Sequence, residues 1–285
     1  MRAAVLNLFG VSALAAALCL TSAGAFAFDD ALYPDLSGQW RRISPPGQPA
    51  FDPAKPRGWG QEVPLTDEYK RVFEENLRDL RAGGEGRWPG YRCRPPGMPA
   101  LMTAYEPMEV IVLPHTTYIR IDHIHETARR IYTDGRDWPK DIAPAWAGYS
   151  IGKWVDEDTD GRYDALEVET RHIKGRRAFD ATGLPMHDDS RTVVKERIFL
   201  DAADRNVLRN EITVIDSALT RPWSVVKTYS RSPERYAIWR EYLCAEENNH
   251  VAIGKESYFL SADGFLMPAK KGQSPPDLRH FEPQR

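Results

Sequence analysis

The sequence is poor in the residues and motifs that identify common enzyme classes. It has three cysteines and seven histidines among 285 residues. It has no Walker loop, no G-x-G-x-x-G segment after a strand and no H-E-x-x-H pair. Ser150 lies between Gly148 and Gly152, but no helix follows, so this segment is not a nucleophile elbow. Serine-hydrolase, ATP-dependent and nicotinamide-dependent reactions are therefore disfavoured, and no catalytic cofactor is expected.

The chain also lacks a strong net charge and a second long apolar run. Its 38 basic and 41 acidic residues give a net charge of −3, which becomes −4 without Arg2. This balance gives no reason to expect nucleic acid or an anionic membrane surface as a partner. After Leu20 no stretch is long and apolar enough to form a membrane span, so none is expected in the mature chain.

The N-terminal residues have the pattern of a cleaved signal peptide. Met1-Arg2 precede an apolar run from Ala3 to Leu20, and Ala25-Phe26-Ala27 has the A-x-A spacing of a cleavage site. A membrane anchor is the alternative, but small residues and no basic stop-transfer patch follow the run. We therefore expect residues 1–27 to be removed and the mature chain to be periplasmic or secreted.

Two cysteines, Cys93 and Cys244, remain in the mature chain. In an oxidising compartment we expect a disulfide between them, which would tie the N-terminal region to the last strands. Catalytic thiol chemistry is the alternative, but an exposed lone thiol would be oxidised in that compartment.

The first hundred residues indicate an arm and one helix ahead of the main domain. Asp35 to Trp40 contains a G-x-W triplet, and residues 44–64 are rich in proline and glycine. Thr66 caps an amphipathic helix that Gly83-Gly84 ends. We expect residues 28–100 to form this arm and helix, with residues 35–42 also pairing with the barrel.

The rest of the chain reads as short strands divided by turns at intervals of about ten residues, the spacing of a meander or barrel. The absence of helical patterns between the strands disfavours a parallel α/β fold. We therefore expect an all-β fold, an antiparallel lipocalin-like meander barrel over residues 101–267, and a loosely ordered tail over 268–285. The expected strands are Met108–Leu113, Thr117–Ile124, Arg129–Thr133, Ala147–Val155, Ala165–Arg171, Thr192–Leu200, Val207–Ile215, Trp223–Ser230 and Ala237–Cys244.

An acidic segment matches the D-x-D-x-D-G-x5-E pattern of a calcium loop, in which alternating carboxylates converge on one ion. Its flanks read as strands and not as the helices of an EF-hand, so any calcium would have a structural role. The alternative is a hydrated acidic hairpin loop. The possible ligands are Asp156, Asp158, Asp160, Asp164 and Glu167.

A dense group of ionisable residues between Asp122 and Trp138 suggests a polar cavity, because buried charge is costly unless it is paired. His123 and His125 share one face of a strand, where a zinc site or a hydrogen-bonded pair is possible. Four glutamates also lie within apolar strands and could face the cavity or the solvent. These are Glu109, Glu196, Glu211 and Glu241.

The cavity hypothesis assigns roles to these groups. His125 would act as general acid or base, Asp122 or Glu126 would orient it, and Arg136 would stabilise an oxyanion. Asp134 would hold an arginine in place. Tyr132 completes the catalytic set by a hydrogen bond to a phenol or carbonyl of the substrate. The substrate-binding set is Arg130, His123, Glu109, Glu196, Glu211, Trp223 and Glu241.

The segment R-R-I-Y-T-D-G-R at Arg129–Arg136 resembles a large group of secreted bacterial proteins. Cys93–Pro99, Gly148–Trp154, Thr220–Trp223 and Glu241–Cys244 match the same group, so the resemblance covers most of the mature chain. It implies a lipocalin-like β-barrel, and the group supplies no settled activity to transfer.

Three functions are consistent with this pattern. The first is a cofactor-independent lyase or isomerase that acts on a small aromatic or apolar compound by proton transfer. The second is a non-catalytic periplasmic carrier of a hydrophobic ligand, and the third is an envelope-associated structural protein. The third would need a large exposed apolar patch, which the sequence does not offer.

Overall fold

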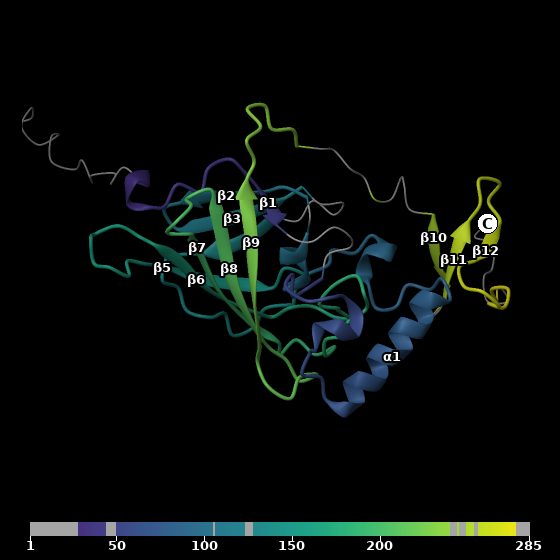
Figure 1. Ribbon diagram of the computed structural model, residues 1–285. Helices are drawn as coiled ribbons and strands as arrows, with labels where there is room; N and C mark the ends of the chain where they lie inside the picture. The colour runs from purple at the N-terminus through teal and green to yellow at the C-terminus, as the bar shows by residue number, and fades with distance from the viewer. Residues whose placement is uncertain are drawn as a thin grey trace, which may run out of the picture.

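Nine strands form a closed barrel in the computed structural model, which describes residues 28–43, 50–104, 106–122, 128–239, 244, 249–253 and 256–277 (Figure 1). Neighbouring strands follow the order of the chain, and the last strand pairs with the first. The expected all-β barrel is therefore confirmed. Its strands are β1 (Gln39–Ile43), β2 (Met108–Leu113), β3 (Thr116–Ile121), β4 (Ala128–Tyr132), β5 (Tyr149–Val155), β6 (Ala165–Arg171), β7 (Val193–Leu200), β8 (Val207–Ile215) and β9 (Trp223–Arg231).

The barrel forms because its strands alternate between buried and exposed side chains. In β7, for example, Val194, Ile198 and Leu200 point to the core, whereas Lys195, Arg197 and Phe199 on the other face contact solvent or are half-buried. Large side chains such as Trp40 and Ile119 fill the interior. A pocket beside Met102 and Tyr229 is too small to hold a water molecule. This part of the barrel is packed.

One strand pairing differs from the expected antiparallel meander. Strands β4 and β5 are parallel, and only Ile131–Ser150 and Tyr132–Ile151 are paired between them. Residues 133–148 carry the chain back to the opposite end of the barrel, and a parallel connection requires about a dozen residues or more. Gly152 permits close packing here, because a Cβ atom on it would lie 2.6 Å from Cγ2 of Ile131.

The barrel strands end at Arg231, and a separate three-stranded sheet follows them. It consists of β10 (His250–Ile253), β11 (Glu256–Leu260) and β12 (Leu266–Pro268). The strand expected at Ala237–Cys244 is wrong for its described residues, 237–239 and 244, which are not in a strand. Because β9 already pairs with both β8 and β1, it offers no free edge to a further strand.

The predicted amphipathic helix is α1 (Asp67–Arg81), which lies between the barrel and the C-terminal sheet in Figure 1. The hydroxyl of Thr66 accepts a hydrogen bond from the Tyr69 amide at 3.4 Å, which caps the first turn. Gly83 adopts a left-handed conformation at the other end, with φ of 87°. Phe73 is buried on the inner face of the helix. No helix in the described part of the chain is long and apolar enough to cross a bilayer.

The expected disulfide between Cys93 and Cys244 is present, with their Cα atoms 5.6 Å apart. Cys93 directly follows a short 3-10 helix, Pro89–Arg92. The bond therefore fixes the region after α1 to the chain that leads into the C-terminal sheet.

Candidate functional site

A fully buried ion pair lies inside the barrel. Arg129 on β4 donates to Oε1 of Glu196 on β7 at 3.0 Å, and its second terminal nitrogen contacts Oε2. Neither side chain is exposed to solvent. This bidentate geometry is the strongest form of carboxylate recognition by arginine. The barrel core requires such a pairing because an unpaired buried charge is very costly.

Three further side chains complete the hydrogen bonds of this pair. Arg129 donates to the Thr170 hydroxyl at 2.9 Å and to the Ser150 hydroxyl at 3.4 Å. The Asn210 amide donates to Glu196 at 2.9 Å. Ser150 is thus a buried partner of the arginine and not an exposed nucleophile. The pair and its partners come from five consecutive strands, β4 to β8.

The expectation that Arg130 faces a cavity is corrected by the strand register. Arg129 and Ile131 point inward, whereas Arg130 and Tyr132 lie on the outer face. Arg130 stacks over the Tyr118 ring, 5.2 Å from its centroid. Neighbouring residues of a strand point to opposite faces, so an error of one residue in the predicted orientation selects Arg130 in place of Arg129.

Arg136 and Tyr132, both assigned to catalysis, contact each other on the surface. The guanidinium of Arg136 lies 3.7 Å from the centroid of the Tyr132 ring. It also donates to Asp134 at 2.8 Å, and this hydrogen bond lowers the pKa of the aspartate to about 2. Asp134 therefore holds an arginine in place, as the sequence suggested, but on the outside of the barrel.

The remaining assigned residues are dispersed. Glu196 faces inward, Glu211 is exposed, and Glu109 accepts a hydrogen bond from Gln39 at 3.2 Å. Trp223 is buried at the start of β9, and Asp122 is buried directly after β3. His123, His125, Glu126 and Glu241 lie outside the described residues.

A second buried polar group was not anticipated from the sequence. Lys227 on β9 is fully buried, and its ammonium nitrogen donates to the carbonyl oxygen of Phe51. Burial, with the nearby Arg42 cation, lowers the pKa of Lys227 to about 7. Burial also raises the pKa of Asp180. The alternation of Val225, Lys227 and Tyr229 was the available signal, because it places the lysine on the inner face.

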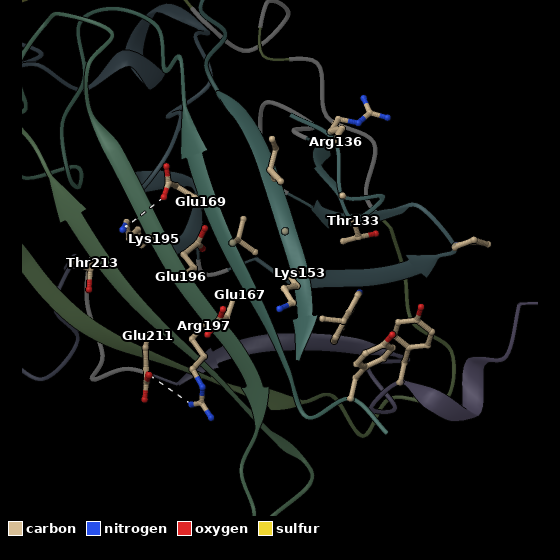
Figure 2. Close-up of a pocket in the computed structure, with 18 residues that line it drawn as sticks. Thr133, Arg136, Lys153, Glu167, Glu169, Lys195, Glu196, Arg197, Glu211 and Thr213 are labelled. Carbon is tan, nitrogen blue, oxygen red and sulfur yellow. Dashed lines mark ion pairs between the residues drawn. The ribbon is translucent and has the colours of Figure 1, made fainter. Parts of the chain in front are cut away.

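The largest described pocket is a groove along the outer face of β5 to β8, with a volume of about 940 Å³ (Figure 2). Opposite charges face one another across these strands, in the order Lys153, Glu167, Arg197 and Glu211. Ion pairs at 3.7 Å join Arg197 to Glu211 and, in the neighbouring row, Lys195 to Glu169. The wall of the groove is therefore charged but balanced.

Aromatic residues form one end of this groove. The ring centroid of Tyr33 lies 5.2 Å from that of Trp154, with the rings nearly perpendicular, and 5.0 Å from that of Tyr163. Both arrangements are favourable for aromatic side chains. The Tyr163 amide donates to the carbonyl of Leu32 at 2.7 Å, which holds the acidic loop against the N-terminal residues.

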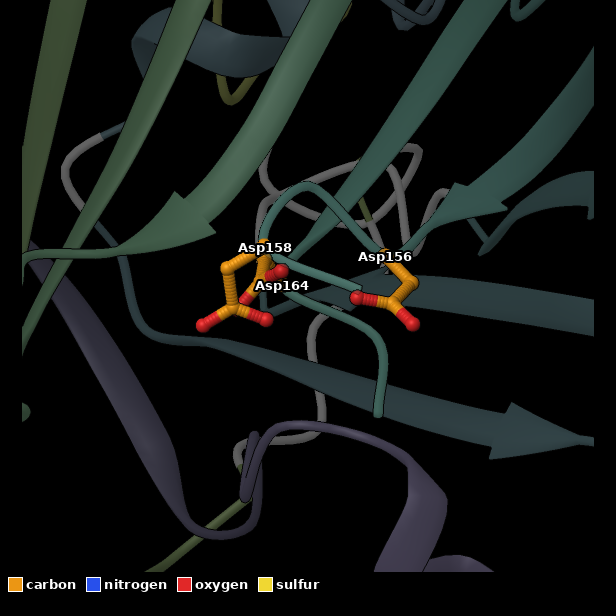
Figure 3. Close-up of side chains that lie close together, drawn as sticks. All are labelled: Asp156, Asp158 and Asp164. Carbon is orange, nitrogen blue, oxygen red and sulfur yellow. The ribbon is translucent and has the colours of Figure 1, made fainter. Parts of the chain in front are cut away.

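The acidic loop brings together three of its five proposed calcium ligands. Asp156, Asp158 and Asp164 each offer an oxygen within 4.8 Å of the others (Figure 3). Asp160 is not part of this group, and Glu167 belongs to the charged row on the groove wall. Backbone amides already donate to the three carboxylates, as Gly161 does to Asp156 at 2.9 Å.

No family model matches the chain, and no curated protein or solved structure is significantly similar to it. Its function is therefore inferred from the barrel and the groove themselves.

Because the ion pair is buried, we expect substitution of Arg129 to lower the free energy of unfolding far more than substitution of Arg130. Arg129→Met should reduce the free energy of unfolding by about 3–5 kcal/mol, because it leaves the Glu196 charge buried alone. The control Arg130→Met should change it by less than about 0.5 kcal/mol. Urea unfolding measures both values. Equal effects of the two substitutions would contradict the inward orientation of Arg129.

The buried amine of Lys227 should make the free energy of unfolding depend on pH. Its pKa is about 7 in the folded chain and near 10.5 when unfolded, so between these values the unfolded chain binds more protons. Stability should therefore rise with pH in this window, by up to about 1.4 kcal/mol per pH unit from this group. Lys227→Met should lose that dependence, whereas Lys195→Met, on the outer face, should keep it. Parallel pH profiles for wild type and Lys227→Met would refute the assignment.

We propose that the acidic loop binds a structural calcium ion. Calcium at about ten times its Kd should then add about 1.4 kcal/mol of stability. Asp158→Asn should abolish this gain and Asp160→Asn should retain it, because Asp160 lies outside the group of three. Thermal unfolding with calcium or with a chelator tests this, and identical melting temperatures in the wild type would end the proposal.

Proposed function

We propose that this protein is a secreted or periplasmic carrier that binds a small aromatic compound with polar substituents. The observation that carries the proposal is the groove on the outer face of β5 to β8, in which an aromatic end adjoins a charged, balanced wall. Its volume of about 940 Å³ lies near the upper limit of the usual range for small-molecule sites.

The aromatic end selects for a flat ring. Tyr33 and Tyr163 line the groove and are half-buried, so each ring keeps an accessible part for stacking. Trp154 supports them from a buried position, which reduces the entropy that the rings lose when a ligand binds. A ligand ring at this end would complete the aromatic cluster.

The charged wall selects for polar substituents of either sign. Arg136, Lys153, Lys195 and Arg197 line the groove together with Glu167, Glu169 and Glu211, whereas the side chain of Glu196 is turned into the barrel. Asp134 neutralises Arg136, so the remaining three positive and three negative groups cancel and the groove does not favour a strongly anionic or strongly cationic molecule. Donors and acceptors on a neutral or zwitterionic compound can both find partners there.

A carrier fits the pairing of these charges better than an enzyme does. Lys195 and Arg197 already form ion pairs with glutamates of the groove, and Glu196 is held by Arg129. Groups that are paired in this way are poorly placed to accept a proton from a substrate. Specific binding requires only their donors and acceptors.

A lyase or isomerase that uses acid–base catalysis is the second candidate. The observation in its favour is Lys227, a buried amine with a pKa of about 7, because such perturbed groups are concentrated at catalytic sites. Lys227 would operate inside the barrel, whereas His125, the proton-transfer group proposed from the sequence, lies outside the described residues.

Mass spectrometry with pooled aromatic acids, phenols and amines distinguishes these functions. The carrier predicts that a compound is retained unchanged, and the enzyme predicts a new product mass. For a retained compound, Tyr163→Ala should raise the Kd by about tenfold through lost stacking. Tyr118→Ala, on the outer face away from the groove, is the matched control. Retention that is insensitive to Tyr163→Ala, or no retention and no conversion, would refute binding in this groove.

A further inference from the structure

Phe51 fills the barrel end at which β9 begins, opposite the end that carries Trp154. Its side chain is fully buried, and its ring centroid lies 5.0 Å from that of Phe179 and 4.8 Å from that of Trp223. Phe179 and Trp223 are themselves 5.0 Å apart. The three rings form a closed aromatic cluster, to which the N-terminal arm contributes only Phe51.

The backbone of Phe51 is bound as specifically as its ring. Its amide nitrogen donates to Oδ2 of Asp180 at 2.9 Å, and its carbonyl oxygen accepts from Lys227. The Lys227 nitrogen also lies 4.3 Å from the centroid of the Phe51 ring, a cation–π distance. The ring, the N–H and the C=O of one residue thus each have a dedicated partner.

A simple hydrophobic plug does not explain the two charged side chains. Burying a lysine and an aspartate is costly, and the shifts of their pKa values, downward for Lys227 and upward for Asp180, record that cost. The other charged groups that act on Lys227 are Arg42, Asp52 and Glu196. Apolar residues at positions 180 and 227 would close the barrel end without this penalty.

From this geometry we infer that the barrel end formed by Phe179, Asp180, Trp223 and Lys227 is a binding site for a small aromatic amide, which Phe51 occupies as an internal ligand. The aromatic pair receives the ring, the aspartate accepts from an N–H, and the lysine donates to a carbonyl. The arm then competes with an external ligand. The site is separate from the groove and does not depend on the proposed carrier function.

The arm has its own internal support. Gln61 is fully buried, and its side chain accepts from the Asp52 amide at 2.7 Å. It donates to the carbonyl oxygens of Asp52, Lys55 and Pro56. These bonds remain within residues 52–61, so this loop can keep its internal fold when the arm moves away from Asp180 and Lys227 as a unit.

The test uses N-acetylphenylalaninamide as the probe. Toluene, which has the aromatic ring but no amide group, is the comparison ligand. Phe51→Ala removes the ring that anchors the arm, so the amide should displace residue 51 from Asp180 and Lys227. It should bind saturably by calorimetry and at least about tenfold more tightly than toluene. Adding Lys227→Met should weaken amide binding at least about tenfold and should affect toluene binding much less, because toluene loses only the cation–π contact. Equal affinities of amide and toluene would show an ordinary core cavity and would overturn the inference.

Phe73→Ala provides the matched control, because Phe73 is also buried and packs on another ring, that of Trp59, at 4.8 Å. Its cavity should show no preference for the amide over toluene. The same preference in this variant would also overturn the inference.

A second measurement does not require the Phe51→Ala variant to fold. In the wild-type protein, excess probe should displace the arm and accelerate hydrogen exchange at the Phe51 amide. Exchange at the Phe73 amide should not change. If the Phe51 amide exchanges at the same rate up to the solubility limit of the probe, the site is not a ligand site.

Discussion

The barrel depends on the buried ion pair that crosses its one parallel seam, which is one of its two sparsely paired seams. Strands β4 and β5 are parallel and share only two paired positions, so backbone hydrogen bonds hold them poorly. Arg129 on β4 spans this seam and contacts Ser150 on β5, Thr170 on β6 and Glu196 on β7. Side-chain hydrogen bonds thus hold β4 and β5 together where backbone hydrogen bonds between the two strands are few. The same interior polarity helps to fix the register of β4, because a one-residue slip would turn Arg129 to the outer face and away from Glu196.

Much of the fold could be predicted because the outer positions of the strands are polar and the inner ones are apolar. The bounds of β6 and β8 follow from this alternation, those of β2 follow from a short apolar run before a turn, and α1 follows from its period and from Thr66. The pairing of Cys93 with Cys244 was predicted from the expected oxidising compartment, in which the two cysteines of the mature chain have one possible partner each.

The site was harder to predict because its chemistry depends on orientation. Arg129 and Arg130 differ only by the face they occupy, and composition cannot distinguish them. Lys227 resembled a solvent-facing residue, since lysines are seldom fully buried. The groove could not be predicted from the sequence either, because its aromatic end depends on contacts that Tyr33 makes with Trp154 and Tyr163, which are far away in the chain. Such contacts depend on long-range packing.

The disulfide gives the molecule an unusual covalent layout. It closes a ring from Cys93 to Cys244, and strands β2 to β9 lie within it, whereas β1 lies outside. A single backbone cut in any loop of that ring leaves the two fragments covalently joined. A cut between β1 and Cys93 instead releases the strand that closes the barrel. The N-terminal connection is therefore the place where a single proteolytic cleavage can open the barrel and separate its parts.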